Sequence, residues 1–119
     1  MKNELILKYR GYLHFVFRVL VGLLFFMHGI QKFSSSFSIM SLMGLAGTIE
    51  VIVGIALIVG ILVRWAALLG AIEMLVAYFM VHFPAGLNPL ANQGEPALLY
   101  FAAFLVLIGY GSVKWPHKP

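Results

Sequence analysis

Four long apolar stretches, separated by short polar breaks, constrain the fold of this chain more than any other feature. At a helical rise of about 1.5 Å per residue, each stretch is long enough, or nearly so, to cross a hydrocarbon core of about 30 Å. We therefore predict an all-α fold, a bundle of four transmembrane helices that forms a single domain over residues 1–119. The predicted spans are residues 11–31, 42–62, 65–83 and 96–111.

Composition supports a membrane environment. Hydrophobic residues make up 62% of the 119 residues and charged residues only 10%, against roughly a quarter charged in soluble domains. The mean hydropathy is +1.00, and a water-soluble core of this size could not hide so much apolar surface. The chain contains no cysteine, which excludes structural disulfides, thiolate metal sites and thiol–disulfide relays.

The placement of basic residues predicts the orientation of the bundle. Only Lys32 lies near one membrane interface, whereas the opposite end of the bundle collects Lys2, Lys8, Arg10, Arg64, Lys114 and Lys118. By the positive-inside rule, both termini and the connection at Arg64 lie in the cytoplasm, and the protein crosses the cytoplasmic membrane several times. Because these basic residues set topology, the net charge of +4 does not indicate a nucleic-acid partner.

Five ionisable residues fall inside the predicted spans, and a sixth stands at a boundary. A charge at the bilayer centre costs about 2.5–3.5 kcal/mol, so each residue needs a partner or a wet cavity. Helical rise places Arg18 about 9–10 Å and Glu73 about 12 Å from the cytoplasmic edge. We therefore predict a structural ion pair between these two residues. The full set is Arg18, His28, Glu50, Glu73, His82 and Glu95.

A polar pocket is predicted nearer the outer face. Glu50 lies about 18 Å deep by helical rise, with no basic residue at matching depth. We expect its carboxyl group to be protonated, to shuttle protons or to bind a ligand. The remaining polar residues cluster at about 24–26 Å. The predicted catalytic residues are Glu50 and His28, and the predicted ligand-binding residues are Gln31, Lys32, His82 and Glu95.

Each of these residues also has a structural interpretation. Glu95 stands at an ordinary helix start, where a carboxylate favours the positive end of the helix dipole. His82 and Lys32 fit headgroup level, and His28 fits a hydrogen bond between helices. On an ideal helical wheel His82 lies about 180° from Glu73. We expect neither haem nor a metal ion to be bound.

Several motifs, in order along the chain, resemble those of the DoxX family of small four-helix membrane proteins. The first helix carries an arginine followed by an FFMHG-x-x-K motif, and the second carries glycines around a glutamate. One departure is that the family often has an Asp after its final glycines and serine, whereas no Asp follows Ser112. The matching residues are Arg18, 25–32, 47–60, 64–67, His82, 94–95 and 109–111.

The resemblance implies a link to membrane redox chemistry. Similar proteins include a subunit of thiosulfate:quinone oxidoreductase and membrane partners of oxidative-stress enzymes. Carried onto this sequence, the resemblance implies a polar site lined by His28, Lys32, Glu50, His82 and Glu95. We expect the membrane subunit of a quinone-dependent oxidoreductase, in which His28 or His82 hydrogen-bonds a quinone cofactor and Glu50 or Glu95 exchanges protons.

Two other functions remain open from the sequence. The first is a non-catalytic membrane scaffold that recruits a redox or stress-response partner. The second is a small-solute transporter that works through Glu50, which is less favoured because no proline interrupts the predicted spans. The expected partners are membrane lipids, a soluble or membrane oxidoreductase, and a second copy of the chain in a homo-oligomer.

Overall fold

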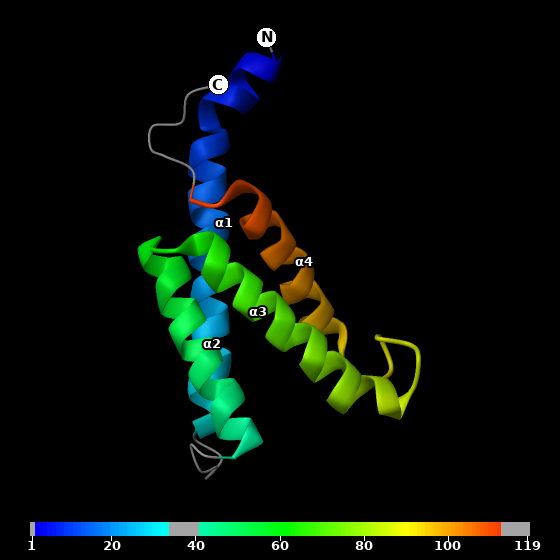
Figure 1. Cartoon of the computed structure of the whole chain (residues 1–119). Coiled ribbons are helices and arrows are strands. Elements are labelled where there is room, and N and C mark those ends of the chain that lie inside the picture. Colours follow the sequence, from blue (N-terminus) through cyan, green and yellow to red (C-terminus); the bar gives the residue numbers. More distant parts are fainter. Residues whose placement is uncertain (1, 34–40, 113–119) are drawn as a thin grey trace.

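The computed structural model describes residues 2–33 and 41–112, which form an all-helical bundle (Figure 1). Two of the basic residues used to predict orientation, Lys114 and Lys118, lie outside the described residues, as does the position after Ser112 where the family often has an Asp. The elements are α1 (Lys2–Phe33), α2 (Leu42–Val59), α3 (Val63–Ala77), the π-helical turn η1 (Tyr78–His82), the 3-10 turn η2 (Phe83–Ala85) and α4 (Glu95–Tyr110).

The helices confirm the predicted fold class of a four-helix membrane bundle. Three apolar helical segments are long enough to cross a membrane, and the 16-residue α4 is a shorter apolar helix. Large apolar side chains are exposed along all four helices, as expected where lipid rather than water surrounds them. The protein is therefore a multi-pass membrane protein.

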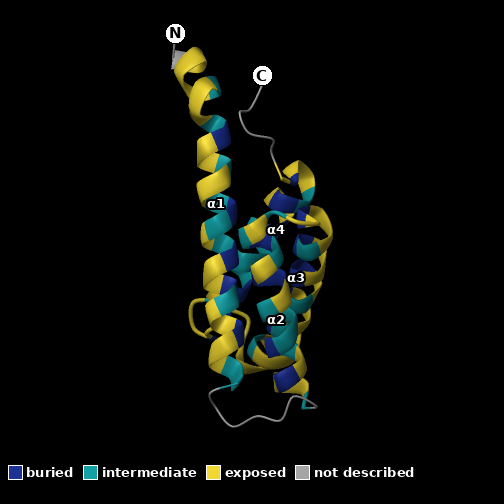
Figure 2. Ribbon diagram, turned by 90° about the vertical axis from the view of Figure 1, so that its left-hand side faces the viewer, coloured by how far each residue is buried: buried dark blue, intermediate teal, exposed yellow. Residues whose placement is uncertain are grey.

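The first helix is longer than its predicted span of 11–31. At 32 residues, α1 is roughly 48 Å long and exceeds a hydrocarbon core of about 30 Å. Its N-terminal turns project beyond the other helices (Figure 2). These turns carry the charged residues Glu4, Lys8 and Arg10, which explains why composition alone placed the start of the span later.

A tight turn joins α2 to α3. The second helix begins at the N-cap Ser41, whose Oγ accepts a hydrogen bond from the Gly44 amide at 3.0 Å. It ends at Val59, because Gly60 adopts a left-handed conformation with φ of +89°. The second helix therefore ends three residues before the predicted 62. The third helix starts at Val63, two residues before the predicted 65.

The first two helices pack through paired glycines. A Cβ atom added to Gly54 would lie 2.7 Å from the Gly22 carbonyl oxygen, and one added to Gly29 would lie 2.8 Å from the Gly47 carbonyl oxygen. Glycines seven residues apart on each helix thus face each other across an antiparallel pair. Small residues permit this backbone contact, which stabilises membrane helix pairs by van der Waals packing.

The helices form two hairpins that diverge at one end. In the second hairpin Gly70 of α3 accommodates the ring of Phe104 from α4, since an added Cβ would lie 2.8 Å from that ring. Phe25, Leu57 and Phe104 are fully buried where the hairpins meet. Toward the start of α2 and the end of α3 the two hairpins separate (Figure 1).

The predicted ion pair between Arg18 and Glu73 does not form. Instead the Arg18 guanidinium donates hydrogen bonds to the carbonyl oxygens of Leu57 and Ile58, at the C-terminal end of α2. The last carbonyls of a helix lack intrahelical donors and carry partial negative charge, so a guanidinium stabilises them. Glu73 lies ten residues beyond the start of α3 at Val63, about 15 Å further along the bundle.

Candidate functional site

A partly enclosed pocket of about 760 Å³ lies where the two hairpins diverge. All four helices and η1 contribute to its wall, which consists mainly of apolar side chains. Its volume is within the range of about 300–1,000 Å³ that small-molecule sites occupy, and such sites combine apolar walls with a few polar groups. The polar lining residues are His28, Lys32, Ser41, Glu50, Glu73, His82, Gln93 and Tyr100.

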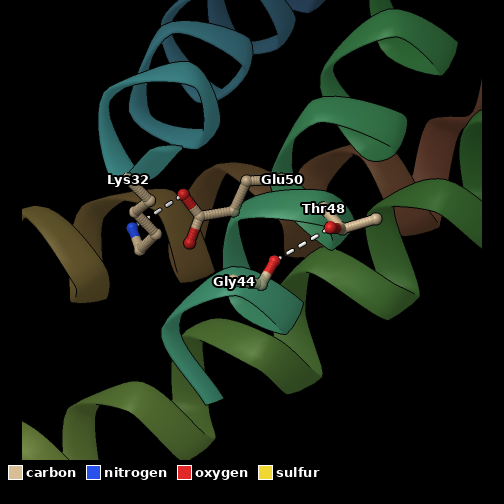
Figure 3. A network of polar contacts seen from close by, with 4 residues as sticks. All are labelled: Lys32, Gly44, Thr48 and Glu50. Atoms are coloured by element: carbon tan, nitrogen blue, oxygen red, sulfur yellow. Dashed lines mark hydrogen bonds and ion pairs between the residues drawn. The ribbon is translucent and has the colours of Figure 1, made fainter. Parts of the chain in front are cut away.

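Lys32 and Glu50 form an ion pair at this pocket. The Lys32 Nζ donates to Glu50 Oε1 at 2.9 Å (Figure 3). The Glu50 side chain is only 1% exposed. The prediction that Glu50 has no basic residue at matching depth is therefore wrong. The glycine pairing explains why: an added Cβ at Gly47 would lie 3.1 Å from the Lys32 Cβ, so the end of α1 lies close enough for the flexible lysine to reach back.

Glu73 belongs to the same cluster as Glu50. Its carboxyl group lies within hydrogen-bonding reach of the Glu50 carboxyl group, and both residues line the pocket. Glu50 lies nine residues before the end of α2 at Val59, and Glu73 lies ten residues after the start of α3 at Val63. Their distances from the turn are thus about 14 and 15 Å. The depths predicted from sequence for Glu50 and Glu73 differed because the α2–α3 turn was placed too far along the chain.

His82 reaches the pocket through the π-helical turn. On an ideal α-helix it would lie opposite Glu73, yet both residues line the same pocket. His82 is the last residue of the η1 turn, whose π-helical winding changes the angular position of His82 relative to Glu73. Turns of this kind are frequent at functional sites. The His82 Nδ1 lies 3.1 Å from the Asn92 carbonyl oxygen. Since a carbonyl only accepts, Nδ1 carries the proton, and Nε2 of the neutral ring is an acceptor.

His28 lies on the edge of the pocket beside an aromatic cluster. Its ring meets Tyr100 edge to face at a centroid distance of 5.3 Å, and Tyr100 in turn contacts Phe25 at 5.1 Å. No described residue forms a hydrogen bond with the His28 ring nitrogens. The predicted pocket residues His28, Lys32, Glu50 and His82 are thus brought together.

Two predicted site residues lie elsewhere. Gln31 and Glu95 are exposed and do not line the pocket. Glu95 is the first residue of α4, which matches its structural interpretation as an acidic residue at a helix start.

Sequence reasoning did not assign four of the polar lining residues to this pocket, namely Ser41, Glu73, Gln93 and Tyr100. Glu73 could have been found by measuring its distance along the chain from Gly60, the glycine that ends α2. Tyr100 lies on the second turn of a helix that is otherwise apolar. No sequence signal fixes the direction in which it points, because all faces of α4 are similar.

Comparison with known proteins places the chain among its relatives. The sequence profile of the DoxX family matches residues 13–83, which include His28, Lys32, Glu50, Glu73 and His82. An uncharacterised protein of Haemophilus influenzae is 37% identical over 118 residues, which cover 88% of this chain and 87% of that protein. No solved structure matches the chain. The matched profile covers more than half of the sequence, and this multi-pass membrane protein therefore belongs to the DoxX family.

Proposed function

We propose that the pocket binds a quinone or a similar lipophilic ring compound, and that the protein acts as a membrane subunit in quinone-linked redox chemistry. The observation that carries this proposal is the largely apolar pocket of about 760 Å³ with a small cluster of ionisable groups on its wall. A bound quinone would supply the electron- and proton-accepting chemistry that amino-acid side chains lack.

The lining residues fit such a ligand. A quinone presents carbonyl oxygens, which need hydrogen-bond donors, and an aromatic-sized ring, which packs well on other rings. Lys32 carries a donor beside the pocket, and Tyr100 carries a hydroxyl group on its wall. His28 is a further donor, since its ring nitrogens have no partner among the described residues. The apolar remainder of the wall suits an isoprenoid tail.

The two histidines take different roles in this proposal. Because Nδ1 of His82 donates to the Asn92 carbonyl, the other ring nitrogen, Nε2, is an acceptor in this tautomer. His82 therefore suits a hydroxyl group of a ligand, and His28 suits a carbonyl group. This division narrows the sequence-based hypothesis, in which either histidine bound the quinone carbonyl.

We further propose that the pocket opens toward the outer face, with both termini in the cytoplasm. The support is the distribution of basic residues: Lys8, Arg10 and Arg64 lie toward the α2–α3 turn end, and the positive-inside rule assigns such an end to the cytoplasm. Labelling of single cysteines placed at residues 61 and 87 in intact and opened vesicles tests this orientation. Labelling of the cysteine at residue 61 from outside intact vesicles would indicate the opposite orientation.

The ligand is tested by purifying the protein in mild detergent and extracting bound lipophilic molecules for mass spectrometry. Co-purified quinone is expected with the native chain. It is expected to be lost with Glu50→Gln and His28→Ala, provided that each variant elutes as a monodisperse, helical protein. Glu95→Gln and Gln31→Ala serve as matched controls, because both residues lie outside the pocket, and both should retain the ligand.

The remaining outcomes overturn the proposal in different directions. A native protein that contains no lipophilic ligand but captures a purified oxidoreductase would indicate a scaffold. Protonophore-sensitive uptake of a solute into vesicles, abolished by Glu50→Gln, would indicate a transporter. Equal ligand retention by the pocket variants and the control variants would show that the ligand binds elsewhere.

A further inference from the structure

The Glu50 carboxyl group has one oxygen satisfied and one without a donor. Oε1 accepts the hydrogen bond from Lys32 Nζ at 2.9 Å. Oε2 is buried and has no hydrogen-bond partner. Because buried polar atoms nearly always have a partner, and an ionised carboxylate can only accept, this oxygen requires a donor.

Glu73 presents the same deficiency from the neighbouring helix. Its Oε1 is also buried without a partner, and its carboxyl group lies within hydrogen-bonding reach of Glu50. Two ionised carboxylates cannot donate to each other, and they repel each other when they are neighbours. A single proton held by either group turns the pair into one donor and one acceptor, which satisfies both carboxyl groups.

The charges around the pair lead to the same proton count. Lys32 contributes one positive charge, and the two carboxylates contribute two negative charges, so one added proton makes the cluster neutral. Neutrality matters because an unpaired charge inside a membrane is costly. The other titratable groups lining the pocket are His28 of α1, His82 of η1 and Tyr100 of α4. His82 is hydrogen-bonded to Asn92 and His28 packs on Tyr100, so Lys32 is the cation bound directly to the carboxyl pair.

We propose that Glu50 and Glu73 share one proton, held beside Lys32, and form a proton-binding site in the wall of the pocket. This inference deepens the proposed function, because a ligand in the pocket would meet this proton site directly. It assigns Glu73 as the proton partner of Glu50 and gives no such role to Glu95. It also identifies the favoured ligand class as compounds whose ring oxygens alternate between carbonyl and hydroxyl forms.

Infrared spectroscopy of the purified protein in lipid nanodiscs tests the shared proton without any ligand. The native protein should show the carbonyl stretch of a protonated carboxyl group, shifted by hydrogen–deuterium exchange. Assignment is direct because the chain has four acidic residues, of which Glu4 and Glu95 are exposed. Glu95→Gln is therefore the matched control and should leave the band unchanged.

Three variants test the shared proton, two by loss of the band and one by its growth. In Glu73→Gln the band should disappear, because the new amide donates to Glu50, which stays ionised beside Lys32. In Glu50→Gln it should also disappear, since Lys32 is then free to pair with Glu73; this variant serves if Glu73→Gln does not fold. In Lys32→Met the band should grow about twofold, because both carboxyl groups then need a proton for neutrality.

The outcomes separate this proposal from the proposed ligand. A native spectrum without the band, or a band unchanged in both glutamine variants, would overturn the proton site while leaving quinone binding to its own test. The band with its expected response in a protein that never contains quinone would uphold the proton site and overturn the ligand assignment.

Discussion

The two ends of the bundle use basic residues in different ways. At the end that contains the α2–α3 turn, Arg18 donates to the terminal carbonyl oxygens of α2. Arg64 packs against Gly111 and lies 3.4 Å from the Gly109 carbonyl oxygen at the end of α4. At the pocket end, Lys32 instead binds the carboxylate of Glu50, beside the carboxyl group of Glu73.

The difference separates architecture from chemistry. Backbone carbonyls at a helix end have fixed positions and do not take up a proton near neutral pH. An arginine that binds them therefore only stabilises the packing of the helices. Carboxyl groups can change protonation state, and a pair of them leaves acceptor oxygens that one lysine cannot satisfy. At the turn end the basic residues thus hold helix ends in place. At the pocket end, carboxyl oxygens remain that can accept a proton or a hydrogen bond from a ligand.

Removing the buried arginine should have the largest effect on stability. We expect Arg18→Leu to lower the free energy of unfolding by about 3 kcal/mol, because charged hydrogen bonds to buried carbonyls are lost. Denaturant titration in mild detergent, followed by circular dichroism, measures this change. Arg64→Leu is the comparison, since the exposed Arg64 should contribute under about 1 kcal/mol. Equal losses of unfolding free energy in Arg18→Leu and Arg64→Leu would show that burial of the arginine does not determine its contribution to stability.

Crowding the glycine seam should come next. We expect Gly54→Ala to cost about 2 kcal/mol, because the added Cβ meets the backbone of Gly22 and Phe26 at 2.7 Å. The same unfolding measurement applies. Gly109→Ala is a matched control in another helix, because nothing lies within 4 Å of its added Cβ. A stable Gly54→Ala protein would mean that the two helices can separate without loss, and that Lys32 need not reach Glu50.

Removing the pocket lysine should cost less than removing the buried arginine. We expect Lys32→Met to lower the free energy of unfolding by about 1 kcal/mol, since the carboxyl pair can compensate by taking up a proton. The measurement is the denaturant titration used for Arg18→Leu, in the same detergent. A loss as large as that of Arg18→Leu would contradict the distinction between the two ends.

The smallest effect is expected at the start of α4. Glu95→Gln should change the free energy of unfolding by about 0.5 kcal/mol, the size of a charge–dipole interaction at a helix end. This variant should retain the ligand as the native protein does, because Glu95 lies outside the pocket. Mass spectrometry of extracted lipophilic molecules measures the retention. Loss of the ligand in this variant would add Glu95 to the functional site.

Part of the site could be predicted from the sequence, because ionisable side chains inside a membrane carry a high free-energy cost and therefore mark functional positions. Lipid tolerates few ionisable groups, so His28, Glu50 and His82 stood out, and the structure brings them into one pocket with Lys32. Depth counting failed for Glu73 because it depended on helix boundaries. Moving those boundaries to Val59 and Val63 brings its depth to within about 2 Å of that of Glu50.

The sequence by itself determined that the chain is a four-helix membrane bundle, because apolar length and the rise of a helix leave few other choices. Only the tertiary structure decided which charges meet. In a nearly uniform apolar helix, packing against neighbouring helices sets the direction in which each side chain points. The π-helical turn reorients His82, and the glycine contacts bring Lys32 close to Glu50.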